Sequence, residues 1–235
     1  MTAPRWRVWT YSAPAIVLGC AQRALLESLT HMPGDLCPLL VRESGGGAVL
    51  TGPWMVGVSV VLPPAHPWVS KGLVESYRPL GQLHGDALQA FGVTSRTLPP
   101  QALRQPNNSV GSRTVDWACF GSLSPWEVVD TQGRKLVGLA QRRRQTGVLL
   151  VAGTLISTVD WALLCEAMGY PQDSPTLARQ TVCAQALADQ PIQSGQFARH
   201  IAQALERELA TSVNSECISP KPGQPGRHHH TEQPQ

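Results

Sequence analysis

The sequence lacks the features that mark several common classes of protein. No apolar run approaches the roughly 20 residues that a membrane-spanning helix needs, so we expect no membrane association. The formal net charge is only +3, from 19 Lys and Arg against 16 Asp and Glu, and this small excess does not indicate a nucleic-acid-binding protein. There is no internal repeat. These absences leave a soluble globular protein as the expected class.

The cysteines lack the spacing that metal sites and disulfide frameworks require. None of the six forms a CxxC pair, so neither a zinc site nor a set of disulfides is indicated. A reducing cytoplasm is the simplest location for such a chain, and we expect no metal centre. Free cysteines are commonly small buried hydrophobic residues. The residue type alone therefore predicts a packing role for all six, which are Cys20, Cys37, Cys119, Cys165, Cys183 and Cys217.

The length of 235 residues is sufficient for one domain with its own hydrophobic core. We expect a catalytic or binding domain over residues 1–212 and a disordered tail over residues 213–235, because the tail is rich in Pro, Gly, Gln and charge. His228 to His230 lie in this tail, where a solvated triplet is favoured over a metal site.

Hydrophobic periodicity predicts strands, mostly in hairpins, with helices inserted between them and at the end. The predicted strands cover residues 7–11, 15–19, 39–42, 48–50, 56–62, 126–129, 135–137 and 148–152, and the predicted helices cover residues 21–29, 73–91, 160–168 and 194–209. This order predicts an α+β fold with a mixed, largely antiparallel sheet flanked by helices.

Single residues predict where some of these helices begin or bend and which side chains they bury. Pro79 should kink or restart the helix in which it lies, and His84 on the apolar face of that helix is best explained as a core histidine. Asp160 and Ser194 are predicted helix N-caps. Residues 94–112, rich in Pro, Asn, Gln and Ser, are predicted to form a long surface loop.

Lys135 is unusual because it begins an apolar, strand-like run between Gly133 and Gly138. An ammonium buried without a partner is costly, so a buried Lys135 requires an anionic neighbour. The two glycines would allow another backbone or a ligand to approach closely. The alternative is an edge strand after a turn at Gln132–Gly133, with Lys135 exposed to water.

A second unusual feature is the run of three glycines, Gly45 to Gly47, which leads directly into the apolar residues 48–50. Consecutive glycines between strands are entropically costly, so they indicate unusual dihedral angles or a closely approaching ligand. A flexible hairpin tip is the alternative interpretation.

Three segments together resemble the lipoate-protein ligase and octanoyltransferase family over residues 5–170. Residues 42–49 (RESGGGAV) resemble the family's RRxSGGGAV, with Val41 at the position of the leading arginine, and residues 133–142 (GRKLVGLAQR) are similar to its GRKxxGxAQxR. Between them, Cys119-Phe120 resembles the ACF segment of cysteine-dependent octanoyltransferases. The resemblance implies the catalytic fold that this family shares with biotin-protein ligases and class II aminoacyl-tRNA synthetases.

The resemblance also implies the chemistry. An octanoyl or lipoyl group, taken from acyl carrier protein or from free lipoate, is attached to one lysine of a lipoyl domain in an E2 subunit or in the glycine-cleavage H protein. Cys119 would carry the acyl group as a thioester, and Lys135 would stabilise developing negative charge and raise the thiolate fraction of Cys119. The implied substrate-binding residues are Arg42, Ser44, Gly45, Gly46, Gly47, Ala48, Gly138 and Ala140.

Two enzymatic mechanisms remain open within this resemblance. A transferase uses the cysteine and requires no cofactor, whereas a ligase uses ATP and Mg²⁺ to form an acyl-adenylate and requires no nucleophilic side chain. The presence of Cys119 favours the transferase. So does the short remainder of about 65 residues after the matched region, which leaves no room for the accessory C-terminal domain of many ligases.

Three positions depart from the family pattern. Thr51 stands where a histidine usually follows GGGAV, Gly57 replaces an expected asparagine, and Ala152 replaces the histidine of the family's QHG. The loss of these polar groups keeps open a third interpretation, a degenerate homologue that binds acyl chains or lipoyl domains without catalysis.

Overall fold

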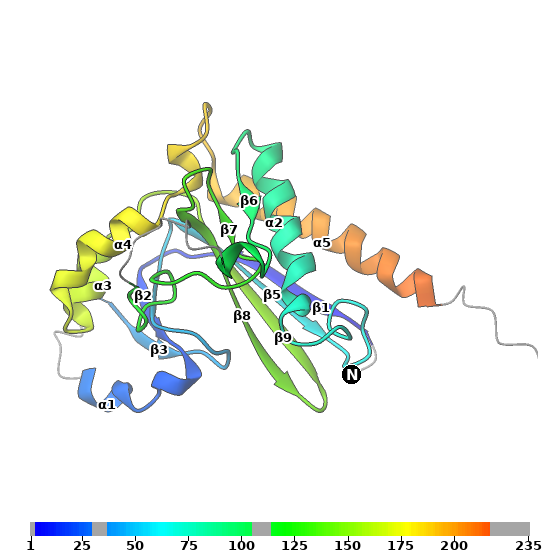
Figure 1. Ribbon diagram of the computed structural model, residues 1–235, viewed down its shortest axis with the longest axis horizontal. Coiled ribbons are helices and arrows are strands. Elements are labelled where there is room, and N and C mark those ends of the chain that lie inside the picture. The colour runs from blue at the N-terminus through cyan, green and yellow to red at the C-terminus, as the bar shows by residue number, and fades with distance from the viewer. Residues whose placement is uncertain (1–2, 30–36, 105–113, 217–235) are drawn as a thin grey trace, which may run out of the picture.

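The structure, a computed structural model, describes residues 3–29, 37–104 and 114–216. Its central element is a six-stranded sheet in the strand order β1-β5-β9-β8-β7-β6 (Figure 1). Every neighbouring pair of these strands is antiparallel. The strands are β1 (Arg5–Thr10), β5 (Met55–Leu62), β9 (Gly147–Leu155), β8 (Lys135–Arg144), β7 (Val128–Val129) and β6 (Arg96–Thr97).

A second, smaller sheet has the strand order β3-β2-β4. Its members are β2 (Ala15–Leu18), β3 (Leu39–Val41) and β4 (Val49–Thr51). Because β2 pairs parallel with β3 and antiparallel with β4, this sheet is mixed. The predicted α+β class with a mixed, largely antiparallel arrangement is therefore confirmed, although the strands form two sheets and not one.

The chain passes from the small sheet to the large one through a tight turn. Met55 N donates to Gly52 O at 2.9 Å, which closes the turn around Pro53. Strand β4 ends just before this turn and β5 begins just after it. This short connection brings the two sheets together, and the space between them is where the candidate site lies.

The helices pack on both sides of this pair of sheets. Figure 1 shows α2 and α5 over one face of the large sheet, with α3, α4 and α1 on the side of the small sheet. The helices are α1 (Leu25–Leu29), α2 (Arg78–Ala90), α3 (Trp161–Ala167), α4 (Ser174–Gln180) and α5 (Ser194–Glu216). The predicted apolar stripe of α5 is confirmed, because Phe197, Ile201, Leu205 and Leu209 are all buried against the large sheet.

Helix boundaries follow local signals in most cases. Helix α2 begins at Arg78 with Pro79 in its first turn, so the proline restarts the helix after the 3-10 turn Glu75–Tyr77. Asp160 caps α3 as predicted, since its side chain accepts from Leu163 N at 3.1 Å. The prediction for Ser194 was wrong. It is the first residue of α5, and its hydroxyl donates to Pro53 O.

Two predicted segments differ from the observed structure in extent. The predicted helix over residues 21–29 consists of a 3-10 turn at Cys20–Gln22 followed by the short α1. The predicted loop over residues 94–112 contains β6 and the 3-10 turn Ala102–Arg104, and its residues 105–113 lie outside the described part. Cys217 and the histidine triplet lie outside it as well, and α5 extends to Glu216.

Candidate active site

Lys135 is the largest fully buried side chain of the described residues, with 2% of its surface exposed. Its ammonium has three N–H donors, and each has an acceptor. Nζ lies 2.7 Å from Glu127 Oε1, 2.7 Å from Cys119 O and 2.9 Å from Ser122 O. The expectation that a buried Lys135 has an anionic neighbour is confirmed, and the alternative of a solvated edge-strand lysine is excluded because β8 is an inner strand.

The anionic neighbour is Glu127, which the sequence did not single out. This carboxylate is 1% exposed and accepts hydrogen bonds from the backbone N–H groups of Ser124 (2.8 Å) and Leu139 (3.1 Å). Burial raises the pKa of the Glu127 carboxyl, although Lys135 and the two N–H groups oppose that shift. Glu127 therefore joins the start of β8 to the loop that carries Cys119.

The approach to β8 is fixed by the predicted turn at Asp130–Gly133. Gly133 has a φ of +82° and donates its N–H to Asp130 O. The Asp130 side chain accepts from the N–H groups of Gln132 and Arg134 and from the Arg134 guanidinium. This rigid turn sets where Lys135 enters the sheet, next to a register shift between β7 and β8.

Arg42 holds the glycine loop through backbone carbonyl groups. Its guanidinium donates to Gly45 O at 2.9 and 3.2 Å, to Gly47 O at 2.7 Å and to Val17 O at 3.0 Å. Gly46 has a φ of +94°, and a Cβ placed on Gly19 would lie 1.7 Å from Gly46 O. The unusual dihedral angle expected in the glycine run is present at Gly46, and the hydrogen bonds from Arg42 to the loop argue against a flexible tip.

Cys119 lies beside this loop. Its N–H donates to Ala48 O at 2.8 Å, and Ala48 N donates to Trp117 O at 2.8 Å. A Cβ placed on Gly46 would lie 4.0 Å from Cys119 Sγ, so the backbone of the glycine run borders the thiol. The side chain is partly exposed, whereas Cys165 and Cys183 are buried.

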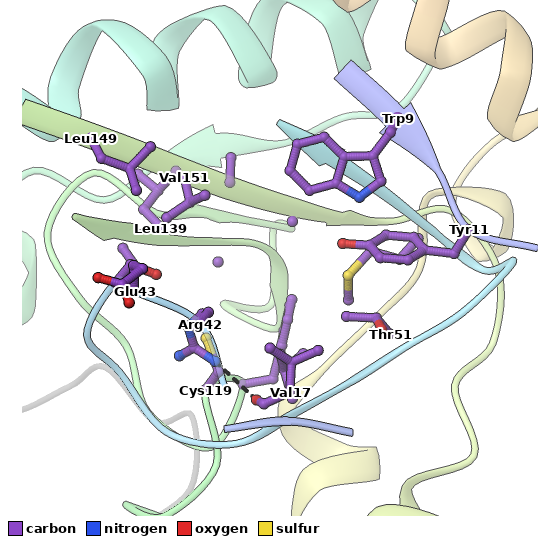
Figure 2. Close-up of a pocket in the computed structure, with 18 residues that line it drawn as sticks. Trp9, Tyr11, Val17, Arg42, Glu43, Thr51, Cys119, Leu139, Leu149 and Val151 are labelled. Atoms are coloured by element: carbon purple, nitrogen blue, oxygen red, sulfur yellow. Dashed lines mark hydrogen bonds between the residues drawn. The ribbon is translucent and has the colours of Figure 1, made fainter. Parts of the chain in front are cut away.

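An apolar cavity of about 320 Å³ lies between the two sheets. Figure 2 shows Cys119 and Arg42 on one side of it, Leu149 and Val151 across from them, and Trp9 and Tyr11 at one end. Most of its lining is hydrophobic. The remaining lining residues are Val17, Glu43, Ser44, Val49, Thr51, Met55, Phe120, Gly138, Leu139, Ala140, Ala152 and Gly153.

The cavity exists because a row of glycines crosses the large sheet. Gly57 of β5 pairs with Gly153 of β9, and Gly153 pairs with Gly138 of β8. Since directly paired residues point to the same face, this row leaves a strip of the sheet without side chains. Trp9 pairs with Gly57, and a Cβ on Gly57 would lie 2.4 Å from the indole. The indole therefore lies over Gly57 and closes one end of the strip.

The two positions of the missing family histidines both line this cavity. Thr51 donates its hydroxyl to Ala15 O at 3.0 Å, and Ala152 contributes an apolar wall. The hydroxyl of Ser44 is buried and has no hydrogen-bond partner among the described residues. Ser44 is thus a polar group with unused hydrogen-bonding capacity among the described residues, in a cavity whose lining is mostly hydrophobic.

A second cavity, of about 360 Å³, meets Cys119 as well. Its lining is more polar than that of the first cavity and includes Asp116, Glu127, Gln22, Ser122 and Ser124. Gly46, Gly47, Ala21, Ala118 and Leu139 complete it. Cys119 and Leu139 line both cavities, so the thiol lies between an apolar chamber and a polar one.

The structure brings the predicted site residues together around Cys119. Arg42, Ser44, Gly138 and Ala140 line the apolar cavity, and Gly46 and Gly47 line the polar one. Gly45 N lies 3.5 Å from Gln141 O, and Ala48 pairs with the Cys119 segment. Lys135 lines neither cavity and acts on the backbone of the Cys119 loop.

Sequence reasoning did not identify Trp9, Tyr11, Asp116 or Glu127 as site residues. Glu127 could have been predicted from the sequence, because a buried lysine needs an acidic neighbour. Glu127 directly precedes the strand that pairs with β8. The others depend on how the two sheets face each other, which no local pattern encodes.

Within the described residues, no group of His, Cys, Asp and Glu has the arrangement of a metal site, and no helix is long and apolar enough to cross a membrane.

Comparison with known proteins agrees with this geometry. Residues 2–206 match the family model of the lipoyl protein ligase A/B catalytic domain. The chain belongs to this family. Among curated members, it is 29% identical over 225 residues to octanoyltransferase LipM of Brevibacillus brevis, covering 89% of this chain and 78% of that protein. It is 30% identical over 195 residues to octanoyltransferase LipM of an Exiguobacterium species, covering 79% and 67%.

Solved structures of the lipoyl protein ligase family share the fold. A putative lipoate protein ligase from Thermoplasma acidophilum with bound lipoic acid superposes with a TM-score of 0.57, at 19% identity, covering 90% of this chain and 73% of that one. A lipoate-protein ligase A bound with ATP gives a TM-score of 0.57 at 18% identity, with the same coverage. At these identities the likeness establishes the fold alone.

Proposed function

We propose that this protein is an acyltransferase of protein lipoylation that moves an octanoyl or lipoyl group onto a lysine of a lipoyl domain through a thioester on Cys119. The observation that carries the proposal is the position of Cys119 between an apolar and a polar cavity, beside the glycine loop. An acyl group on this sulfur extends into the hydrophobic chamber, and its carbonyl carbon stays at the boundary where a second substrate reaches it.

The apolar cavity suits a medium-length acyl chain. Its walls are hydrophobic side chains from both sheets, and each methylene buried there contributes about 0.8 kcal/mol to binding. Trp9 and Tyr11 close the end of the chamber, and Cys119 lies on its wall (Figure 2). The chain therefore binds with its reactive end at the thiol.

Transfer begins when the Cys119 thiolate attacks the carbonyl carbon of the acyl donor and the donor thiol leaves. Negative charge develops on the carbonyl oxygen in this step and needs hydrogen-bond donors. Gly46 and Gly47 line the polar cavity together with Cys119, and their N–H groups donate to no described residue, so these groups are candidates for this role. Ser44 offers a further hydroxyl with no partner among the described residues.

Lys135 acts as a positioning residue in this proposal. All three of its N–H donors are engaged, and two of them hold the carbonyl groups of Cys119 and Ser122. The lysine therefore fixes the shape of the nucleophile loop, while its own charge is balanced by Glu127. A direct contact between its ammonium and substrate would require one of the three bonds to open.

The ATP-dependent ligase is the alternative within the family, and the polar cavity does not favour it. A nucleotide phosphate next to the reacting carbonyl needs basic side chains or helix N-termini around it. In the part of the chain that the structure describes, two acidic residues and no Lys, Arg or His line the polar cavity. The curated relatives described above are octanoyltransferases, which supports the same choice.

The partners follow from the reaction proposed. The acyl donor is an octanoyl thioester of acyl carrier protein, and the acceptor is a lipoyl domain of an E2 subunit or the glycine-cleavage H protein. One structural neighbour is described as a lipoate protein ligase solved as part of a study of its E2 lipoyl domain. We expect neither ATP nor a metal ion to be required.

The decisive experiment is intact-mass measurement after incubation with octanoyl-acyl carrier protein. The wild-type protein should gain one octanoyl group, which hydroxylamine removes, as expected for a thioester. Cys119→Ala should gain none. Cys20→Ala is the matched control, because Cys20 is exposed and lines neither cavity, and it should be acylated like wild type.

Three results would contradict the proposal. An octanoyl adduct that persists in Cys119→Ala would remove Cys119 as the nucleophile. Lipoylation of a lipoyl domain by Cys119→Ala with free lipoate and ATP would establish the ligase mechanism. Absence of transfer from wild-type protein under both conditions would indicate a binding protein without catalysis.

A further inference from the structure

The polar cavity has a charge pattern that the acylation step does not use. Glu127 is paired with Lys135, so this carboxylate contributes no net charge to the cavity. Asp116 is exposed, lines the same cavity and contacts no cation among the described residues. No Lys, Arg or His of the described residues lines the cavity, and Arg42 lines the apolar chamber. Among the described residues, the negative charge of Asp116 at the polar cavity therefore has no cationic partner.

Its remaining lining suits a slender polar group. Gln22, Ser122 and Ser124 provide hydrogen-bonding side chains, and Gly46 and Gly47 remove side chains from the wall nearest the thiol. Gln22 is held in place because its Nε2 donates to Trp117 O at 2.9 Å. A volume of about 360 Å³ admits an extended, unbranched side chain that ends at Cys119.

We infer that the polar cavity receives the side chain of the acceptor lysine, and that Asp116 attracts its ammonium group. This inference rests on the function proposed above and assigns the second substrate to its own cavity. A free lysine side chain is protonated at neutral pH, because its pKa is about 10.4. A negative cavity next to the thioester raises the local concentration of such a cation.

The chemistry of the second step balances with this assignment. The lysine nitrogen forms a bond to the acyl carbon, and the bond between that carbon and Cys119 Sγ breaks. The ammonium group loses two protons, and one of them is transferred to the departing sulfur, which becomes a thiol. The other leaves through Asp116 to water at the mouth of the cavity, so that a neutral amide is released.

The test compares thiol reagents of opposite charge, and it does not depend on acyl transfer. Cationic 2-aminoethyl and anionic 2-sulfonatoethyl methanethiosulfonate both convert Cys119 to a mixed disulfide, and peptide mapping separates that reaction from the one at exposed Cys20. We expect the cation to react faster at Cys119 by on the order of tenfold, relative to the same ratio at Cys20. In Asp116→Asn this preference should fall towards one.

Asp189→Asn is the matched control, because it makes the same change in net charge at an exposed position that lines neither cavity. It should keep the wild-type preference. A Cys119 preference of one or less in wild type, or one that Asp116→Asn leaves unchanged, would overturn the inference.

A second measurement follows the preformed octanoyl-Cys119 enzyme. Asp116→Asn should raise the KM for the lipoyl domain by roughly tenfold, and Asp189→Asn should not. An unchanged KM would also contradict the inference. If no octanoyl adduct forms in any variant, the proposed function fails, whereas the charge preference at Cys119 still decides the nature of the cavity.

Discussion

The two ends of β8 carry the same sign of charge in opposite surroundings. At its start, Lys135 is fully buried, and its ammonium contacts one carboxylate and two carbonyl groups. At its far end, Arg142 and Arg144 lie at the surface and share the exposed carboxylate of Glu43. Arg23 also approaches Glu43, at 3.7 Å. Glu43 thus has three cationic neighbours, while Glu127 has one.

The number of ion pairs is a poor guide to their importance. Exposed pairs contribute about 0–1 kcal/mol, because water and salt screen them and long side chains lose freedom. A buried pair contributes little net stability either, since both charges lose hydration, but removal of one partner leaves an uncompensated buried charge. The single pair at the start of β8 should therefore dominate both stability and function.

The largest expected effect comes from breaking the buried pair. Glu127→Gln should lower the free energy of unfolding by about 3–5 kcal/mol, because the ammonium of Lys135 remains buried without its counter-charge. Lys135→Met should have a similar effect for the complementary reason. Urea unfolding followed by circular dichroism measures both.

The double variant Glu127→Gln/Lys135→Met tests whether charge is the cause. It removes both charges together and should recover most of the lost stability. Acyl transfer should nevertheless stay slower than wild type by on the order of 100-fold, because the Cys119 and Ser122 carbonyl groups lose their common donor and the loop shifts. A double variant as unstable as either single one, or one with full activity, would contradict this account of Lys135.

His84 extends the comparison because it is as buried as Lys135, but no described residue places an opposite charge beside it. Its Nδ1 lies 2.8 Å from Leu80 O, and burial lowers the pKa of the imidazole from 6.5 to about 4. The folded state thus binds the proton less readily than the unfolded state. The stability that this provides is complete above about pH 6.5 and is lost as pH falls towards 4, by about 3 kcal/mol in total.

The measurement is the free energy of unfolding at pH 7.5 and pH 4.5 for wild type and for His84→Gln. Carboxyl groups titrate in both proteins, so the difference between the two pH dependences isolates His84. We expect the variant to lose less stability on acidification. Equal losses in the two proteins would show that His84 is not kept neutral in the fold.

The smallest effect is expected at the exposed end of β8. Glu43→Gln removes the carboxylate that faces three arginines, and it should change the free energy of unfolding by less than about 1 kcal/mol. The change should shrink further at high salt. A loss of unfolding free energy as large as that of Glu127→Gln would contradict the proposed difference between the two ends of the strand.

The sequence was most informative where one residue constrained its own surroundings. Lys135 in an apolar run predicted an anionic neighbour for a buried ammonium, and Gly45 to Gly47 predicted unusual dihedral angles or a close ligand. Both predictions were correct because they follow from costs that act locally. The turn at Asp130–Gly133 and the cap at Asp160 were predictable for the same reason.

The remaining features depend on contacts between distant segments. The division into two sheets requires knowing that β2 pairs with β3 and β4 and not with the large sheet. The glycine row requires the register of three strands, and the position of Asp116 requires the path of the Cys119 loop. The assignment of a fold came from the family resemblance, since strand order was not available from periodicity.

The glycine row allows the length of the apolar cavity to change in two opposite ways. A side chain added at Gly153 would meet Met55 Sδ at 3.2 Å, and one added at Gly138 would meet Phe120 at 3.4 Å, so substitutions in the row shorten the chamber. A smaller residue in place of Trp9 would lengthen it. The side chains at the glycine positions and at position 9 together set the length of the cavity. In a lineage of such enzymes, preference for shorter chains should evolve in the row and preference for longer chains at the aromatic end wall.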